Sequence, residues 1–351
     1  MDMPSNIRTS QGDIRRVGVE LEFVGIDLLS AAEAVRDVCG GAINRRSDYE
    51  VAVDCSSYGS FRVEYDSNYL KQVQKGTSFE SDGIVSRLFG NKPEVLLSMD
   101  RDEQIEPGII EKLLRSLASL EVVSPPIKIT ELYTLNQLIT GLHRRGAKGT
   151  RNQPLRALGL HFNPEVVSKD VSNILPVLKA FLCLYDRLLV LESVDIVRKI
   201  YPYIQPFPLD YVKLVINPRY NPPLDIVIMD YLEFNPTRNR PLDLLPLFMT
   251  ILPDLVQRKV DSSLVSSRPT FHYRLPNSEV DDPAWSLTGA WNNWVMVEKL
   301  AYDASLLDKL CRAYSDHLER TQQLSSAGWI HILDALVTPS GAISNFLPIG
   351  S

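Results

Sequence analysis

Acidic and apolar side chains alternate in residues 17–23, near the start of the chain. The odd positions of this segment are apolar, and Glu20 and Glu22 occupy even positions between them. A repeat of two residues predicts a β-strand that buries one face and exposes the other. The exposed carboxylates can bind a divalent cation or simply face solvent, and this segment alone leaves both interpretations open.

Side chains capable of chemistry also lie on four further predicted strands. They are Glu64, Glu121, the pair His161 and Asn163, and Glu233. If the polar faces of these strands line one cavity, several carboxylates and an imidazole converge, which is costly unless cations compensate the charge. Carboxylate-rich sites suit Mg²⁺ or Mn²⁺, and one histidine is compatible with Mn²⁺ or with a site that bridges phosphates. Singly, each residue also has a structural explanation, as a solvated strand face, a hydrogen-bonded histidine or a charged sheet edge.

The elements that must position these side chains follow from periodicity and from helix start and stop signals. Ser30-Ala31-Ala32-Glu33 fits a capping box, and Gly40-Gly41 ends that first helix. Strands are expected at 17–23, 61–65, 121–126, 158–163 and 226–234, and further helices at 107–120, 130–142, 173–191, 242–260 and 285–314. Pro246 and Pro253 are expected to kink the helix over 242–260. Residues 70–102 are polar and irregular and are interpreted as an insertion or a flexible flap.

The polar faces of the strands decide between two kinds of sheet. Strands separated by helices can form a parallel sheet, but parallel strands that are buried on both faces are apolar throughout. We therefore predict an α+β fold, a curved antiparallel sheet with one polar, functional face and with helices packed on its outer face. Trp285, Trp291 and Trp294, at helical spacing, are interpreted as core residues rather than as a platform for a ligand.

Composition and charge are those of an ordinary globular protein. Of the 351 residues, 44% are hydrophobic and 23% are charged, which is enough for a large core in one domain or two. The net charge of −6 argues against nucleic acid as the main partner, because phosphate binding needs a basic surface. Nucleotide binding stays open, because metal ions can supply the positive charge.

Targeting features and cysteines suggest a cytoplasmic protein. The first residues lack the basic and apolar regions of a signal peptide, and residues 1–12 are expected to form a disordered tail. No uncharged apolar run reaches the roughly 18 residues of a membrane span, so no membrane partner is expected. The four cysteines lack any C-x-x-C spacing and are expected to be reduced thiols: Cys39, Cys55, Cys183 and Cys311.

Four segments resemble, in order, motifs of the amidoligases, a family related to glutamate–cysteine ligase and glutamine synthetase. Residues 16–23 (Arg-Val-Gly-Val-Glu-Leu-Glu-Phe) are similar to the family's opening strand, and residues 121–126 (Glu-Val-Val-Ser-Pro-Pro) to its Glu-hydrophobic-hydrophobic-Ser-Pro segment. Residues 159–163 (Gly-Leu-His-Phe-Asn) resemble its Gly-Leu-His-x-His/Asn strand, and residues 232–238 its late Glu-x-x-x-x-Arg strand. Each match is short, and their common order makes the resemblance specific.

The resemblance implies a glutamine-synthetase-like fold, in which antiparallel strands form a funnel and ATP enters at one mouth. It implies an ATP-dependent ligase that phosphorylates a carboxylate and lets an amine attack the acyl phosphate, forming an amide. The substrates would be small molecules, peptides or proteins, and the cofactors ATP with Mg²⁺ or Mn²⁺. Residues 13–330 would be one catalytic domain with an insert at about 67–105, and residues 331–351 a C-terminal extension.

The resemblance also assigns roles to individual side chains. One metal would be held by Glu20, His161 and Glu233, and the other by Glu22, Glu64 and Glu121. Arginine binds phosphate or carboxylate oxygens bidentately, so Arg238 and Arg274 are expected in catalysis, and Arg268 with Arg238 in nucleotide binding. The alternative for each arginine is a surface ion pair. Asn163 stands where a second histidine is common and is expected to position substrate or phosphate.

Two other functions stay open at the level of sequence. The long interval between Glu64 and Glu121 departs from the family pattern, and the insert there is a candidate lid or substrate-selecting element. The same side chains would suit a metal-dependent hydrolase, or a catalytically inactive protein of this fold that binds a nucleotide or another ligand. Dependence of turnover on ATP separates the ligase from the hydrolase.

Overall fold

One antiparallel sheet organises the protein. The computed structural model describes residues 1–65, 119–150, 158–194, 204–261, 265–324 and 327–337. Within these ranges nine strands form a sheet of order β2-β3-β4-β5-β1-β7-β9-β8, with β6 also paired to β1. The strands are Arg16–Phe23 (β1), Ala42–Arg45 (β2), Glu50–Cys55 (β3), Gly59–Tyr65 (β4), Leu120–Val123 (β5), Ile127–Lys128 (β6), Leu160–Pro164 (β7), Leu242–Asp243 (β8) and His272–Tyr273 (β9).

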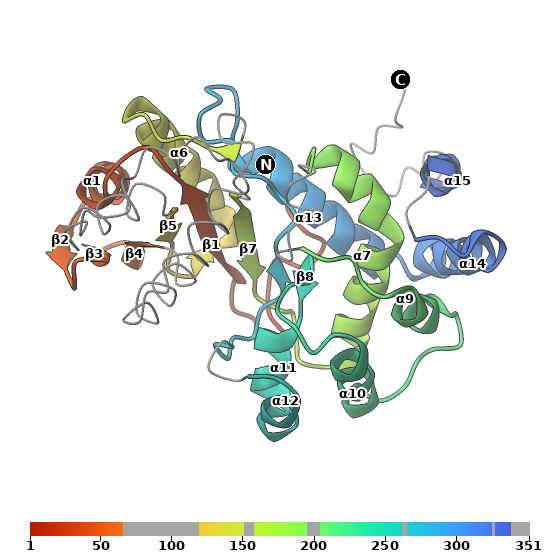
Figure 1. Cartoon of the computed structure of the whole chain (residues 1–351). Coiled ribbons are helices and arrows are strands. Elements are labelled where there is room, and N and C mark those ends of the chain that lie inside the picture. The colour runs from red at the N-terminus through yellow and green to blue at the C-terminus, as the bar shows by residue number, and fades with distance from the viewer. Residues whose placement is uncertain (66–118, 151–157, 195–203, 262–264, 325–326, 338–351) are drawn as a thin grey trace, which may run out of the picture.

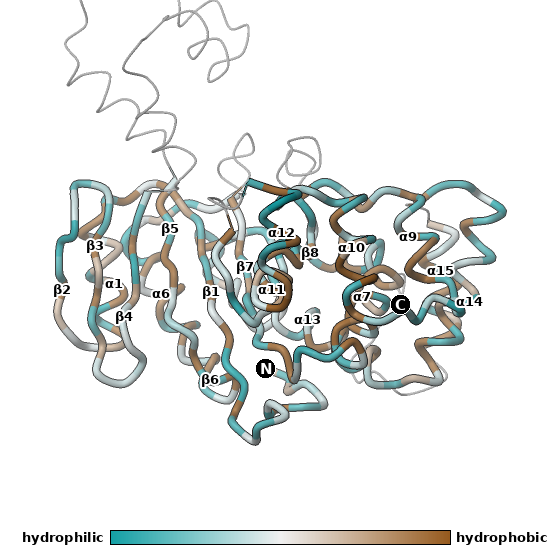
Figure 2. Tube along the Cα trace, turned by 90° about the horizontal axis from the view of Figure 1, so that it is seen from below, coloured by the Kyte–Doolittle hydropathy of each residue, from teal (hydrophilic) through white to brown (hydrophobic). Residues whose placement is uncertain are grey.

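The pairing confirms an antiparallel α+β fold. Each pair of neighbouring strands is antiparallel, and β1 lies in the middle between β5 and β7. The apolar side chains of β1 are buried, with Val17 and Phe23 fully inaccessible, and the residues between them are partly exposed. Figure 2 shows this alternation of hydrophobic and hydrophilic residues along the tube of β1. The funnel shape expected from the resemblance stays a prediction.

Helices cover the apolar face of the sheet. Their bounds are Leu28–Cys39 (α1), Leu135–Arg144 (α6, after a 3₁₀ turn at Ile129–Thr134), Val171–Leu191 (α7), Leu209–Ile216 (α9), Leu224–Phe234 (α10), Leu245–Ile251 (α11), Pro253–Lys259 (α12), Leu287–Tyr302 (α13), Ala304–Thr321 (α14) and Ala327–Val337 (α15). In Figure 1, α1, α6 and α13 lie along one side of the strands, and α9, α14 and α15 lie beyond α7. Trp291 and Trp294 on α13 are fully buried, which confirms them as core residues.

Three predicted elements are wrong in type or extent. Residues 226–234 were expected to be a strand and belong to α10, which buries Val227, Ile228, Tyr231 and Leu232 at helical spacing. The helix expected over 242–260 consists of β8, α11 and α12, with a break at Pro253. The helix expected over 285–314 ends at Tyr302, and Asp303 caps the next helix by accepting a hydrogen bond from the backbone N–H of Leu306.

Both ends of the described chain pack on the fold. We expected a disordered tail at residues 1–12, yet the indole Nε1 of Trp291 donates to the carbonyl of Asp2, and Lys299 pairs with its carboxylate. The boundary expected at residue 330 falls inside α15, where the ring of Trp329 stacks on Tyr314. The expected limits of the tail, the catalytic domain and the C-terminal extension stay predictions. The expected insert at 67–105 lies outside the described residues.

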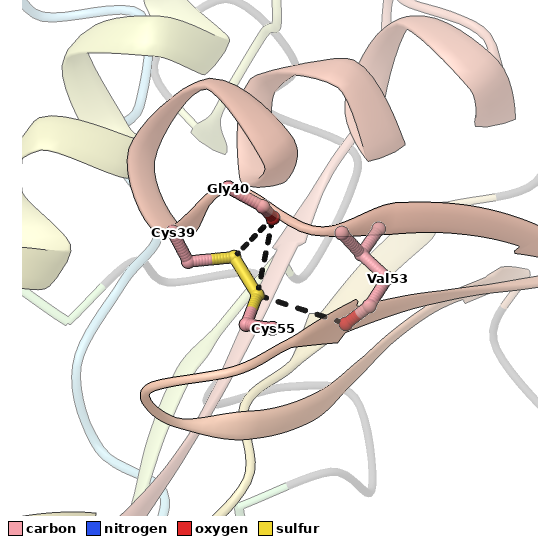
Figure 3. The surroundings of a disulfide bond; sticks show 4 residues. All are labelled: Cys39, Gly40, Val53 and Cys55. Carbon is pink, nitrogen blue, oxygen red and sulfur yellow. Dashed lines mark hydrogen bonds between the residues drawn. A yellow bond between two sulfur atoms is a disulfide. The ribbon is translucent and has the colours of Figure 1, made fainter.

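A disulfide bond links the end of α1 to the end of β3. The sulfurs of Cys39 and Cys55 are bonded and lie against the carbonyl of Gly40 (Figure 3). This corrects the expectation that all four thiols are reduced; Cys183 and Cys311 are free and buried. Every helix in the described part of the chain is too short or too polar to cross a membrane. A cytoplasmic location stays a prediction.

Gly41 is a position that only glycine can fill. Its φ is +93°, and a Cβ there would lie 2.1 Å from the carbonyl oxygen of Asp54. We therefore expect Gly41→Ala to lower the free energy of unfolding by about 2 kcal/mol or more, measured by urea denaturation. The control is Gly289→Ala on the exposed face of α13, where a Cβ meets nothing within 4 Å. That change should be neutral or stabilise by up to about 1 kcal/mol, and equal losses in both variants would contradict the expectation.

Candidate active site

The strand register lines up carboxylates in a row across the polar face of the sheet. Glu22 on β1 pairs with Glu121 on β5, Glu121 pairs with Glu64 on β4, and Glu64 pairs with Glu50 on β3. Paired residues of antiparallel strands point to the same face. The structure therefore brings together three acids that the sequence predicted as metal ligands, Glu22, Glu64 and Glu121, and adds Glu50 beside them.

Glu20 lies two residues back on β1, on the same face, and is held by three donors. Its Oε2 is 3.2 Å from Nδ1 of His161, its partner in the register of β7. Its Oε1 accepts a 2.9 Å hydrogen bond from Nδ2 of Asn163 and a 3.0 Å bond from Nη1 of Arg268. The carboxylate side chain is only 12% exposed, so these bonds replace most of its water.

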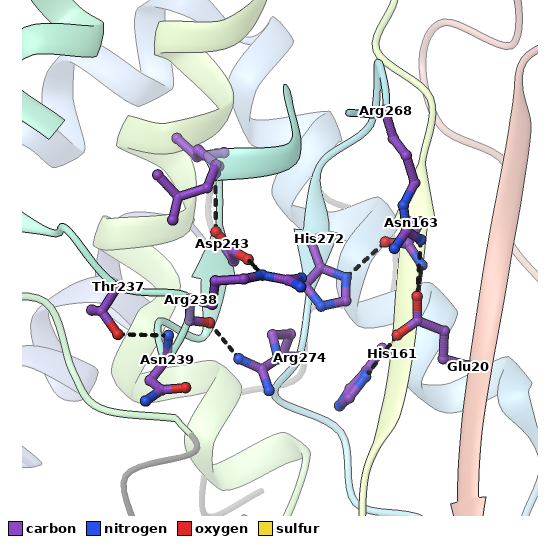
Figure 4. Close-up of polar contacts among 12 residues, drawn as sticks. Glu20, His161, Asn163, Thr237, Arg238, Asn239, Asp243, Arg268, His272 and Arg274 are labelled. Carbon is purple, nitrogen blue, oxygen red and sulfur yellow. Dashed lines mark hydrogen bonds and ion pairs between the residues drawn. The ribbon is translucent and has the colours of Figure 1, made fainter. Parts of the chain in front are cut away.

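His272 joins this cluster from β9. Its Nδ1 is 2.7 Å from Oδ1 of Asn163, so the amide of Asn163 bridges His272 and Glu20. The rings of His272 and His161 stand edge to face with centroids 5.3 Å apart. Both imidazoles are buried, and Figure 4 shows them on the same side of Asn163 and Glu20, with His272 beside Asn163 and His161 beside Glu20.

The charges of the cluster are strongly coupled. Burial opposes ionisation of Glu20, but attraction to His272 when that ring is protonated, the hydrogen bond from His161 and the Arg268 guanidinium hold its pKa well below the usual range. Burial also lowers the pKa of His272 well below its usual value, and the nearby Arg274 adds to the shift while Glu20 opposes it. Desolvation raises the pKa of Glu64, against the attraction of Arg62. The cluster thus combines an ionised carboxylate with a neutral imidazole.

Two of the predicted arginines lie beside His272. Nε of Arg238 pairs with the buried Asp243 at 3.0 Å, and Nη1 of Arg274 donates to the carbonyl of Arg238. In Figure 4 both guanidinium groups lie on the side of His272 away from Glu20. Arg268 reaches Glu20 from the opposite side, so the three arginines flank one group of residues. Guanidinium groups in such positions can bind phosphate or carboxylate oxygens.

Glu233 is not part of this site. It lies on α10, its side chain is 70% exposed, and it forms an ion pair with Lys259 at 3.1 Å. The predicted strand was wrong because the apolar residues around Glu233 recur at helical rather than alternate spacing. His272 stands in the cluster where Glu233 was expected.

The described residues contain two sets of side chains that could hold a metal ion. Glu20, His161 and His272 form one set, and Glu22, Glu121 and His161 form the other, with ligand atoms within 4.8 Å of one another in each. Carboxylate and imidazole are the donors that Mg²⁺, Mn²⁺ and related divalent ions take in proteins. The residues therefore fit the metals that the resemblance implies.

Comparison with known proteins decides the family. A family model described as "Putative amidoligase enzyme" matches residues 13–296, which include every described strand. The chain belongs to the amidoligase family. No curated protein and no solved structure matches the chain. The helices α14 and α15 of this amidoligase lie beyond the matched region.

His272 and Asp243 belong to the candidate site of the amidoligase, and sequence analysis missed both. Both lie on strands of two residues, too short for a periodicity to be recognised. The sequence nevertheless contains a short alternation at this point: the aromatic residues Phe271 and Tyr273, which the structure buries, alternate with His272 and Arg274. This is the pattern of β1 over half its length.

His272 should stay neutral in the metal-free amidoligase at pH values where a free imidazole, with a pKa of about 6.5, already takes up a proton. Protonation would place a cation in a buried site near Arg274, which is why the pKa is lowered. Long-range ¹H–¹⁵N spectra of histidine-labelled, EDTA-treated protein would show that the ring whose signals are lost in His272→Gln is fixed as the Nδ1–H tautomer. A titration of that ring with a midpoint near or above 6.5 would contradict the expectation.

Proposed function

We propose that this amidoligase is an ATP-dependent carboxylate–amine ligase. The observation that supports the proposal best is the gathering of Glu20, Glu22, Glu121, His161 and His272 on one face of the sheet. Arginines flank that group, and so the same surface offers ligands for divalent cations and donors for phosphate oxygens. A surface that only had to be soluble would not need a buried imidazole bonded to a nearly buried carboxylate.

The proposed reaction transfers the γ-phosphoryl group of ATP to a substrate carboxylate. An amine then attacks the resulting acyl phosphate, loses a proton, and releases phosphate as the amide forms. Bound Mg²⁺ or Mn²⁺ would neutralise the charge on the phosphoryl oxygens during transfer. Glu22, Glu64 and Glu121 would hold one ion, and Glu20 with the imidazoles the other.

The arginines serve the anionic partners in this proposal. Arg268 is 36% exposed and reaches the site from the segment before β9, so it suits a flexible contact to the nucleotide phosphates. Arg238 and Arg274 are held by Asp243 and by backbone, and suit a fixed contact to the transferred phosphoryl group or to the substrate carboxylate. Asn163 uses both ends of its amide inside the site, so it positions the carboxylate and imidazole that bind the metal.

A matched pair of variants tests the nucleotide site. Glu121→Gln removes a charge from the carboxylate row and should weaken binding of Mg-ATP at least about tenfold, measured by titration calorimetry. Glu233→Gln is the control, because its carboxylate lies outside the site, and should leave Mg-ATP affinity unchanged. Both changes are nearly isosteric. Unchanged affinity in Glu121→Gln would place the nucleotide elsewhere.

The reaction itself is tested by isotope transfer. Pools of carboxylic acids labelled with ¹⁸O, with and without pools of amines, are incubated with the protein and Mg-ATP. We expect ADP release to depend on the amine and one ¹⁸O to appear in the inorganic phosphate, because the acyl phosphate leaves with the carboxylate's oxygen. Turnover without nucleotide would favour a hydrolase, and tight ATP binding without phosphate release would favour a binding protein.

Arg268 should contribute to nucleotide affinity. Removing its charge by Arg268→Gln deletes a charge-assisted contact to phosphate, worth about 1.5–3 kcal/mol, so the KM for ATP should rise roughly tenfold or more. Arg258→Gln on α12 is the matched control on the protein surface. If Arg268→Gln and Arg258→Gln have the same KM, Arg268 only neutralises Glu20.

A further inference from the structure

Glu20, His161 and His272 form a ligand set in which two of three donors are nitrogen. We propose that these three residues bind a first-row transition ion such as Mn²⁺, Fe²⁺ or Zn²⁺ in preference to Mg²⁺, and that the carboxylate row takes Mg²⁺. The inference deepens the proposed function, since both ions would serve the same reaction. It names His272 as a ligand and gives the two positions different metal chemistry.

The hydrogen bonds fix which nitrogen of His272 is available. The carboxylate of Glu20 can only accept, so Asn163 must direct its NH₂ group toward Glu20. Its carbonyl oxygen Oδ1 then faces His272, and an oxygen acceptor requires a proton on Nδ1 of the imidazole. In a neutral ring this leaves the lone pair on Nε2. A fixed N–H partner on one ring nitrogen is the usual arrangement of a metal-binding histidine.

His161 belongs to both candidate sets but can serve only one ion at a time. A neutral imidazole has a single lone pair, and its other nitrogen carries a proton. An ion in the carboxylate row has an alternative ligand in place of His161, because Glu64 pairs with Glu121, which in turn pairs with Glu22. The set around Glu20 has no comparable oxygen within it. His161 is therefore assigned to the set with His272: its Nδ1–H is bonded to Glu20, and the lone pair of Nε2 is left for the ion.

Nitrogen donors determine the preference between metals. Mg²⁺ is a hard ion that keeps water and oxygen ligands, whereas imidazole suits Mn²⁺, Fe²⁺ and Zn²⁺. One carboxylate with two imidazoles and open positions is an arrangement typical of transition-metal sites. Arg268 now neutralises Oε1 of Glu20, and a bound cation would take over that role.

Electron paramagnetic resonance with Mn²⁺ tests the proposal. Full-length protein is stripped with chelator and titrated with Mn²⁺ in about a hundredfold excess of Mg²⁺. We expect Mn²⁺ to stay bound under these conditions, and its spin-echo spectrum to show modulation from coordinated ¹⁴N. The spectrum distinguishes imidazole coordination from an ion held by carboxylates alone. If His272 had only a structural role, its nitrogen would not contribute to this modulation.

Two histidine variants make the test specific. His272→Gln should lower Mn²⁺ affinity at least about tenfold and reduce the ¹⁴N modulation by about half. His331→Gln, on the exposed side of α15, should change neither. Wild-type protein whose Mn²⁺ is displaced by Mg²⁺, or whose spectrum lacks ¹⁴N modulation, would overturn the inference, and this arm does not depend on the folding of any variant.

The outcomes separate this inference from the proposed function. Nitrogen-coordinated Mn²⁺ in a protein that neither binds nor uses ATP would support the metal site and refute the ligase. Amine-dependent use of Mg-ATP by a protein without nitrogen-coordinated Mn²⁺ would support the ligase and refute the metal site. Unaltered ¹⁴N modulation in His272→Gln would remove His272 from the ligand set.

Discussion

Glu20 is a nearly buried carboxylate, and the centre of the protein is arranged to keep it charged. Its donors come from two distant segments of the chain, the strand β7 and the residues before β9. Leaving such a charge without partners would cost several kcal/mol, so β1, β7 and β9 have to meet at this point. Asn163 extends the constraint to His272, and the positions of the arginines follow from the segments next to β8 and β9 that carry them.

The same strand builds the core and the site. Because side chains alternate along β1, the residues that point away from Glu20 and Glu22 lie under α6 in the apolar layer. A slip of one position in the register would bury both acids and expose the core. Ser124 opposes such a slip, since its backbone N–H donates to the carbonyl of Val19 and its hydroxyl accepts from the N–H of Val19. The Ser-Pro segment thus fixes the end of β5 on β1.

How far the sequence predicted this protein depends on the length of each element. β1 and β7 are long enough for alternation to be evident, so Glu20, Glu22, His161 and Asn163 were placed correctly on one face. His272 was missed because β9 has two residues, and pairing with β7 rather than local sequence makes it a strand. Glu233 was misplaced because a short apolar run fits a buried strand as well as a helix, and burial on one side of α10 decided for the helix. Periodicity also could not predict the long-range contacts of Asp2 with Trp291 and Lys299.

The arginines and carboxylates of the site show how it could receive highly charged ligands. Arg268 neutralises Glu20, Arg62 neutralises Glu64, and Arg238 neutralises Asp243. Divalent cations and a polyphosphate bring charges of both signs, so each can take over one partner of such a pair. In the proposed ligase, cations would replace arginine at Glu20 and Glu64, and the released guanidinium groups would bind phosphate, while Asp243 keeps Arg238 in place. The number of paired charges is conserved in that exchange, which keeps the cost of desolvation low when the ligands enter. Metal and nucleotide would then bind with positive coupling: the cation pairs with the carboxylate, and the phosphate pairs with the arginine that the cation has displaced.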